Sequence, residues 1–181
     1  ILQKNITKIF MDEDKLNRLP PDVKKQFVKL AEKLSEKKQK TKVHDDFLTF
    51  VKHVWPEFIE GAHHKKIAEK FNDIANKKIK RLIINMPPRH TKSEFASFLL
   101  PSWMVGRKPN LKIIQTTHTT ELAIRFGRKA KTLMDSAEYK QVFKTRLRED
   151  SQAAGKWETE QGGEYYAAGV GSAITGRGAD L

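Results

Sequence analysis

The fold is decided by residues 82–93, which read Leu-Ile-Ile-Asn-Met-Pro-Pro-Arg-His-Thr-Lys-Ser. An apolar run comes first, a loop with two adjacent prolines comes next, and the segment ends in Lys92-Ser93. The glycine-rich loop that cradles nucleotide phosphates reads Gly-x-x-x-x-Gly-Lys-Ser/Thr. Here Met86 replaces its first glycine and Thr91 replaces its second. Spacing alone leaves open whether this is a phosphate-binding loop or an ordinary loop with an accidental Lys-Ser pair.

The residues on either side of the loop supply the context that phosphate binding needs. Residues 81–85 form a short apolar run, which predicts a buried strand, and residues 93–103 predict a helix that ends near Pro101. Backbone N–H groups and the helix dipole favour an anion at a helix N-terminus. A lysine that reaches the β/γ-phosphates and a hydroxyl that binds Mg²⁺ complete such a site, and Lys92 and Ser93 stand at those positions.

The loop lacks both glycines and contains two prolines, which donate no N–H group. A phosphate cradle would therefore depend on the amides of residues 89–93. Arg89 adds a guanidinium group, which suits multidentate phosphate recognition. Thr91 is the weak point, because a β-branched residue is strained at positive φ. We therefore expect Thr91 to keep a negative φ, and the loop to differ locally from the glycine-containing form.

Apolar spacing predicts the other elements. Helices are expected from residue 22 to the charged run 36–42, over 45–54, after Gly61 and over 120–134, and strands over 111–117, 157–159 and 165–170. The last two strands are expected to form a hairpin through Gly162-Gly163, and residues 137–148 read as basic and irregular. The order strand, loop, helix, strand, helix indicates an α/β fold with a parallel sheet.

The charge of the chain favours a polyanionic partner. Its 181 residues include 35 Lys+Arg and 22 Asp+Glu, for a formal net charge of +13. Such an excess indicates DNA, RNA or a phosphate-rich ligand, although a basic protein without such a partner is the plain alternative. A basic helix face formed by Arg125, Arg128 and Lys131 could meet DNA phosphates or a neighbouring subunit, or simply face solvent.

Two further features exclude classes of protein. The chain contains no cysteine, so disulfides and thiolate metal sites are excluded. No apolar run approaches the length of a membrane-spanning helix, and we expect no membrane partner.

Several segments, in order, resemble the large terminase subunits of tailed bacteriophages, the motors that package DNA. Residues 85–94, Asn-x-Pro-Pro-Arg-His-x-Lys-Ser-Glu, resemble their variant phosphate loop. Residues 61–64, Gly-Ala-His-His, resemble the segment before that loop. The segments that resemble the part of the family after that loop are 100–103 (Leu-Pro-Ser-Trp), 106–109 (Gly-Arg-Lys-Pro), 114–118 (Ile-Gln-Thr-Thr-His), 121–126, 169–172 and 175–181. The resemblance covers roughly residues 42–181.

The resemblance implies an additional-strand P-loop NTPase fold, with a mainly parallel central sheet flanked by helices and preceded by N-terminal helices. It implies an N-terminal helical, basic segment over residues 1–41 and an ATPase domain over residues 42–181. That domain would be cut before its Walker B strand, and a C-terminal nuclease domain would be absent. We expect the fragment alone to hydrolyse ATP poorly, because the acidic residues that organise Mg²⁺ and water would lie beyond Leu181.

The implied activity is ATP hydrolysis that drives double-stranded DNA into a procapsid through its portal, in the host cytoplasm. The full-length protein would also be an endonuclease. The implied partners are double-stranded DNA, the portal protein and procapsid, the small terminase subunit and further copies of the chain in a ring.

The resemblance also implies roles for residues of the loop, with ATP and Mg²⁺ as cofactors. Lys92 would contact the β/γ-phosphates, Ser93 would bind Mg²⁺, and Arg89 would sense the γ-phosphate. The implied nucleotide-binding residues are Pro88, Arg89, His90, Thr91, Lys92, Ser93 and His64. The plain alternatives are a helix start with an exposed lysine and a capping serine, and a surface ion pair for Arg89.

Two roles lie outside the loop. Arg177 sits in a glycine-rich turn and could act as an arginine finger on the γ-phosphate of a neighbouring subunit, or it could pair with a local carboxylate. Trp55, Phe58 and His64 could border the adenine, or they could be core residues.

Two competing functions remain open at the level of sequence. One is another nucleic-acid-dependent P-loop ATPase, such as a helicase. The other is a non-catalytic DNA-binding module that uses its positive charge.

Overall fold

The computed structural model describes residues 18–181, and the chain divides into two compact units, Ile1–Thr41 and Lys42–Leu181. The helix α3 (Pro21–Asp45) crosses the boundary between them. It runs through residues 36–42, so the prediction that this charged run ends the helix is wrong. Lysine, glutamate and glutamine are good helix formers, and a helix face in solvent tolerates their charge. The first part of the predicted segment 1–41 lies outside the described residues.

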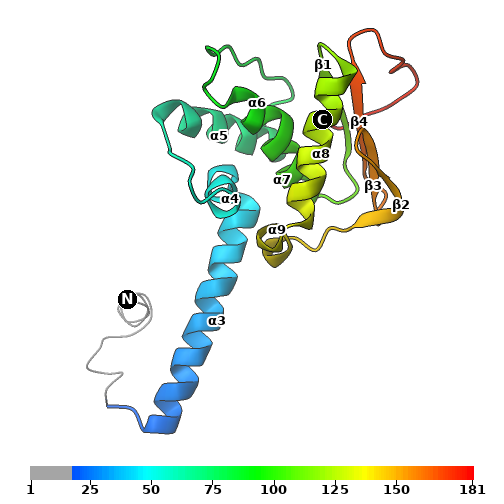
Figure 1. Cartoon of the computed structure of the whole chain (residues 1–181). Helices are drawn as coiled ribbons and strands as arrows, with labels where there is room; N and C mark the ends of the chain where they lie inside the picture. The colour runs from blue at the N-terminus through cyan, green and yellow to red at the C-terminus, as the bar shows by residue number, and fades with distance from the viewer. Residues whose placement is uncertain (1–17) are drawn as a thin grey trace. The chain divides into compact units, whose positions relative to one another are not determined.

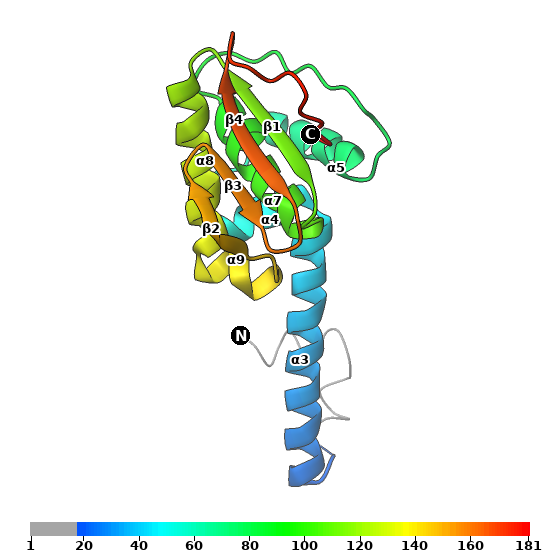
Figure 2. The same ribbon diagram turned by 90° about the vertical axis from the view of Figure 1, so that its right-hand side faces the viewer.

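A four-stranded sheet with the order β1-β4-β3-β2 forms one layer of the second unit (Figure 2). Its strands are β1 (Lys112–Thr117), β2 (Leu147–Ala153), β3 (Lys156–Thr159) and β4 (Glu164–Gly169). The α/β class is confirmed, but the sheet is mixed, because only β1 and β4 pair in parallel. The predicted β3–β4 hairpin is confirmed, and its short connection forces those two strands to be antiparallel.

Helices cover one side of this sheet. In Figure 1, α8 (Thr120–Asp135) lies between the sheet and the remaining helices, and it contacts β1, β4 and α7. Gly127 lets α8 approach the sheet, because a Cβ atom there would lie 2.7 Å from the Tyr165 ring and would also meet the carbonyl oxygen of Ala154. Trp157 donates its indole N–H to the carbonyl oxygen of Gly127 at 3.3 Å.

Five more helices and one π-helical turn complete the described elements. They are α4 (Phe47–Val54), α5 (Ala62–Ala75), α6 (Lys92–Glu94), η1 (Phe95–Leu99), α7 (Leu100–Arg107) and α9 (Ala137–Val142). The helices predicted over 45–54, after Gly61 and over 120–134 are confirmed as α4, α5 and α8. The prediction that residues 137–148 are irregular is wrong, because Ser136 caps α9 through the N–H of Tyr139 and β2 begins at Leu147.

An aromatic cluster forms the core beneath these helices. The ring of Phe47 makes edge-to-face contacts with Phe71, Phe95 and Trp103 at centroid distances of 5.0, 5.4 and 5.4 Å. The buried indole N–H of Trp103 donates to the carbonyl oxygen of His44 at 3.0 Å. Since Phe95 lies one turn after Lys92, this cluster anchors the start of the helix that leaves the loop.

That helix is continuous from Lys92 to Arg107, through α6, η1 and α7. The prediction that it ends near Pro101 is wrong. A proline supplies no N–H and crowds the preceding turn, and the wider π-helical turn before Pro101 accommodates both effects. In this turn the N–H of Leu100 donates to the carbonyl oxygen of Phe95.

The predicted buried strand over residues 81–85 is wrong. The segment is extended but belongs to no strand, and Ile83 is 85% exposed. Among residues 18–181, no backbone hydrogen bond involves 81–85. A cavity of about 720 Å³ lies beside this segment, lined in part by Leu82, Ile84 and Leu111. Within residues 18–181 no strand pairs with the segment, and residues 180–181 bond to the edge of β1.

Candidate phosphate-binding site

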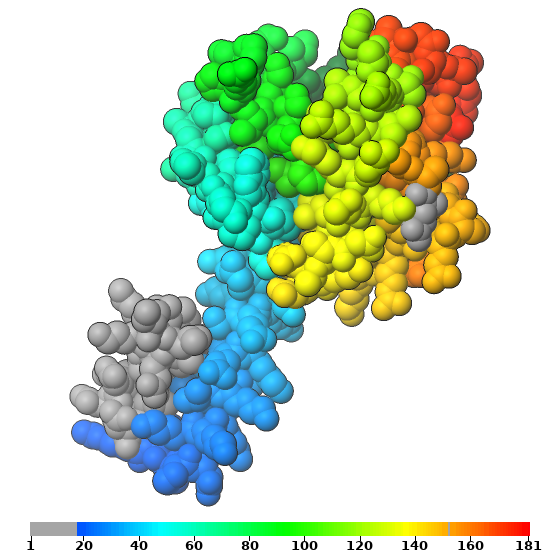
Figure 3. All heavy atoms as spheres, in the orientation of Figure 1, coloured from blue at the N-terminus to red at the C-terminus, as the bar shows by residue number. Residues whose placement is uncertain are grey.

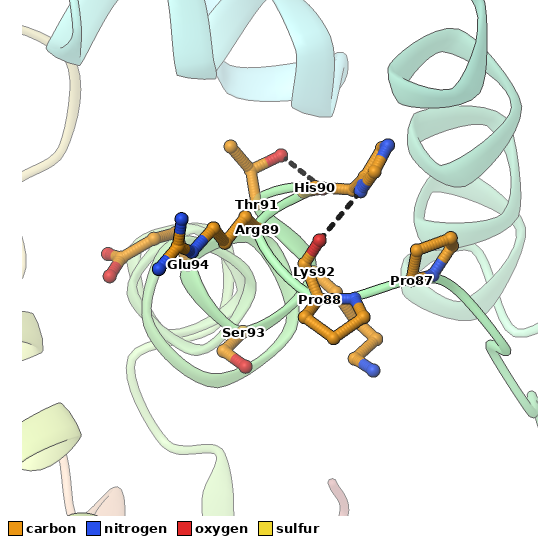
Figure 4. Close-up of a pocket in the computed structure, with 8 residues that line it drawn as sticks. All are labelled: Pro87, Pro88, Arg89, His90, Thr91, Lys92, Ser93 and Glu94. Carbon is orange, nitrogen blue, oxygen red and sulfur yellow. Dashed lines mark hydrogen bonds between the residues drawn. The ribbon is translucent and has the colours of Figure 1, made fainter.

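The loop lines an open cavity of about 560 Å³ at the start of the helix Lys92–Arg107 (Figure 4). It is lined by residues 87–94, which include every loop residue that the sequence predicts for nucleotide binding. The cavity thus brings together Pro88, Arg89, His90, Thr91, Lys92 and Ser93. His64 contacts the loop at Thr91 but does not line the cavity.

Backbone conformations in the loop alternate as in an anion-binding nest. Arg89 has a φ of 62° and Thr91 a φ of 57°, whereas His90 between them is not among the residues with positive φ. Thr91 is left-handed (ψ 8°) and directly precedes the first helical residue, Lys92. Alternation of this kind turns successive N–H groups toward one point, which favours an anion there. The prediction that Thr91 keeps a negative φ is therefore wrong.

Hydrogen bonds to the Thr91 side chain explain how a β-branched residue holds this conformation. Its hydroxyl donates to the carbonyl oxygen of His90 at 2.7 Å and accepts from Nε2 of His64, also at 2.7 Å. The N–H of Gly61 donates to Nδ1 of His64 at 2.9 Å. Because Nδ1 is the acceptor in that bond, the proton of a neutral His64 is on Nε2, where it points to Thr91.

The ring of His64 is buried between aromatic side chains. It is 5% exposed, and its centroid lies 4.8 Å from the ring of Phe58 and 5.0 Å from that of Phe95. Burial lowers the pKa of His64 below 6.5, nearby His63 and His90 lower it further, and Glu60 opposes the shift. The imidazole is therefore neutral at pH 7, as the hydrogen bonds require. Its Nε2 atom contacts Thr91 of the loop, and a role for His64 beside adenine stays a prediction.

Lys92 and Ser93 present their polar atoms on the opposite side of the loop from the side chains of Thr91 and His90 (Figure 4). The amine of Lys92 donates to the carbonyl oxygen of Met86 at 3.3 Å, so the side chain folds back over the loop. Ser93 is exposed, and within the described part of the chain its hydroxyl has no hydrogen-bond partner. Both residues line the cavity.

An ion pair that the sequence did not predict ties the loop helix to α8. Nζ of Lys129 lies 2.6 Å from Oε1 of Glu94, and the same amine lies 5.6 Å from the ring centroid of Phe98. The pair offsets the one negative charge that lines the cavity. Nothing in the local pattern links residues 94 and 129, because the contact forms only when α8 packs against the helix that leaves the loop.

Arg177 does not line the cavity of the loop. Its guanidinium donates to Oε1 of Glu164 at 2.7 Å and lies 3.9 Å from the ring centroid of Tyr166, against β4. Within one chain Arg177 thus pairs with a local carboxylate, which is the plain alternative to an arginine finger. Its action on a neighbouring subunit stays a prediction.

The basic face of α8 lies on the surface. Arg125 and Arg128 are exposed, and Figure 3 shows α8 on the front face of the second unit.

Two kinds of feature are absent from residues 18–181. No group of three or more His, Cys, Asp or Glu side chains is arranged to hold a metal ion, and no helix is long and apolar enough to cross a membrane.

Comparisons with known proteins found no match: no family model, no curated protein and no solved structure matches the chain.

Proposed function

We propose that residues 87–94 bind the phosphates of ATP, and that the chain is the ATPase part of a DNA-packaging motor of the large terminase class. The observation that carries phosphate binding is left-handed Thr91, placed directly before the helix that begins at Lys92. A glycine occupies this conformation in the usual phosphate loop, where it aims the following amides at the ligand. Thr91 adopts it without being glycine, which supports the same use.

The side chains fit the charges of a magnesium nucleotide. Lys92 and Arg89 supply positive charge beside the amides, and the exposed hydroxyl of Ser93 would bind Mg²⁺, which neutralises phosphate charge in such sites. Hard oxygen ligands suit this cation, and one hydroxyl is a usual protein contribution because Mg²⁺ keeps several waters. Loop and helix thus provide an anion site with a cation ligand next to it.

The DNA-packaging part of the proposal rests on the resemblance of residues 42–181 and on the net charge of +13. A charge of this size favours a long polyanion such as double-stranded DNA. The portal, the small subunit and the ring of copies belong to the same proposal.

Substitution of Lys92 tests nucleotide binding. Lys92→Ala is expected to raise the Kd for a fluorescent ATP analogue in the presence of Mg²⁺ at least tenfold, because a charge-assisted bond to phosphate is lost. Fluorescence titration measures the Kd. Lys66→Ala is the matched control, because Lys66 is an exposed lysine on α5 and does not line the cavity.

The same titration separates the competing functions. Equal binding by wild type and Lys92→Ala, or no binding by either, would reject a phosphate loop. If double-stranded DNA still binds in that case, the chain is a DNA-binding module without nucleotide chemistry. A helicase-like ATPase would share the loss in Lys92→Ala, and would differ by unwinding a duplex with a single-stranded tail.

A further inference from the structure

We propose that His64 is a positioning residue, which holds the phosphate-binding loop in its left-handed form by a hydrogen bond to the hydroxyl of Thr91. The inference rests on the proposed function, because it assigns a role within the same site. In this role His64 acts on the loop backbone and does not contact the adenine base.

The hydroxyl of Thr91 is the point where the loop is tied to another element. Within residues 18–181 it has two hydrogen bonds, one to the carbonyl oxygen of His90 and one from Nε2 of His64. The bond to His90 is between adjacent residues and moves with the loop, so it cannot fix the loop in space. The bond from His64 joins positions that are 27 residues apart and comes from the first turn of α5.

His64 is itself held at both ring nitrogens and on its faces. The N–H of Gly61 bonds to Nδ1 at 2.9 Å, which leaves the Nε2 proton for Thr91. Phe95, whose ring lies 5.0 Å from the imidazole, belongs to the helix that begins at the end of the loop. A single buried ring therefore fixes the position of the loop residue and of the helix start relative to α5.

Threonine needs this support, whereas glycine does not. A left-handed backbone is costly for a β-branched residue and free for glycine, so the penalty must be offset by contacts of the side chain. The threonine hydroxyl provides the contact. The importance of His64 therefore depends on which residue occupies position 91.

A double-mutant cycle tests this dependence. His64→Phe keeps an aromatic ring of similar volume in the cluster and removes the hydrogen bond. It is expected to raise the Kd for the fluorescent ATP analogue with Mg²⁺ about tenfold in the wild-type background. In the Thr91→Gly background the same substitution is expected to change the Kd less than twofold, because no hydroxyl is left to hold. His64→Gln, which can still donate near the position of Nε2, is expected to recover most of the wild-type Kd.

A second ligand distinguishes an effect of His64 on the loop from an effect on the adenine base. Tripolyphosphate with Mg²⁺ has no adenine, so competition by tripolyphosphate is expected to weaken in His64→Phe by the same factor as ATP binding. An equal loss in both Thr91 backgrounds would overturn the positioning role. A loss for ATP but not for tripolyphosphate would also overturn it and would favour contact with adenine. Circular dichroism and thermal unfolding establish that each variant is folded. If His64→Phe does not fold, Thr91→Val and Thr91→Ser repeat the comparison, with loss expected in the valine variant alone.

The Lys92→Ala variant keeps the two proposals distinct. If Lys92→Ala abolishes binding while His64→Phe has no effect, the phosphate loop stands and the role of His64 fails. If neither substitution changes binding, the proposed function fails first.

Discussion

Thr91 combines an unfavourable backbone conformation with a side chain that compensates for it. The cost of a left-handed L-residue is about 1–2 kcal/mol, which is comparable to one or two net hydrogen bonds. Its hydroxyl makes two such bonds, one of them to buried His64. A glycine would have the same φ without this hydrogen bond. Threonine adopts the conformation at a higher cost, but it gains a hydrogen bond to His64 of α5.

This connection explains why the sequence predicted the chemistry of the loop but not its conformation. Lys92 and Ser93 are recognisable from their spacing, because the phosphate-loop motif is local. The φ of Thr91 depends on His64, and no local pattern contains both residues. The spacing of Gly61 and His64 at the start of a helix could have predicted the bond between those two residues, because a side chain at the third helical position often bonds back to the cap, but it does not point to Thr91.

Titration of His64 gives a prediction at the residue scale. Its pKa is lowered in the folded chain by burial first, and the folded protein therefore binds fewer protons than the unfolded one below about pH 6.5. The contribution of neutral His64 to the free energy of unfolding is complete above pH 6.5, and it is lost as the pH falls from 6.5 toward the pKa of the folded state. The free energy of unfolding, measured by urea titration from about pH 7 to about pH 5.5, is expected to fall with pH in wild type and to fall less in His64→Phe. His118→Phe replaces an exposed histidine and serves as control. Identical slopes in wild type and His64→Phe would contradict the burial of a neutral imidazole.

At the scale of elements, the long amphipathic helices were predictable and the short or partner-dependent segments were not. The spacing of apolar residues in α5 and α8 places one face in the core, and this pattern needs no knowledge of the rest of the fold. Residues 81–85 have strand-forming side chains, but a strand also needs a hydrogen-bonding neighbour. The strand β2, with the sequence Leu-Arg-Glu-Asp-Ser-Gln-Ala, has a neighbour and little apolar pattern.

The close approach of α8 to the sheet gives a prediction for this scale. Gly127→Ala is expected to lower the free energy of unfolding by about 1–3 kcal/mol, because the added methyl group overlaps the carbonyl oxygen of Ala154 and the ring of Tyr165. Urea unfolding monitored by tryptophan fluorescence measures the change. Gly178→Ala is the matched control, because a Cβ atom at Gly178 would meet nothing within 4 Å. Comparable losses in the two variants would show that the close approach does not set the cost, because helix propensity and chain entropy both favour alanine at Gly127.

At the scale of the molecule, charge and fold class were readable from the sequence, and the topology of the sheet was not. Counting lysine and arginine against aspartate and glutamate gives the net charge directly, and the alternation of predicted strands and helices gives the α/β class. Strand order depends on which edges meet, and here one parallel pairing is joined to two antiparallel ones. The mainly parallel sheet that the resemblance implies is therefore not what residues 18–181 form.

The exposed arginines of α8 give a prediction for DNA binding. Replacing both Arg125 and Arg128 by alanine is expected to weaken binding to double-stranded DNA and to reduce the slope of log Kd against log salt by about 1–2, because two phosphate contacts are lost. Fluorescence anisotropy at several salt concentrations measures the slope. Arg148→Ala is expected to have little effect, because its guanidinium already pairs with Asp150 and Glu158 at 2.6 and 3.1 Å. If the α8 variant keeps the wild-type slope, DNA does not bind at this face.

The unpaired segment 81–85 has a consequence for cooperativity. It leads into the loop from the N-terminal side, so the loop continues into a helix at one end and, at the other, into a segment with no backbone hydrogen bond among residues 18–181. Ordering a free backbone costs about 1–2 kcal/mol per residue, and a bound phosphate that orders the loop must supply part of that free energy. A strand that pairs with residues 81–85 would supply this free energy before the phosphate binds. Nucleotide and pairing strand would then strengthen each other's binding by the same factor, as thermodynamic linkage requires of two ligands that order the same residues.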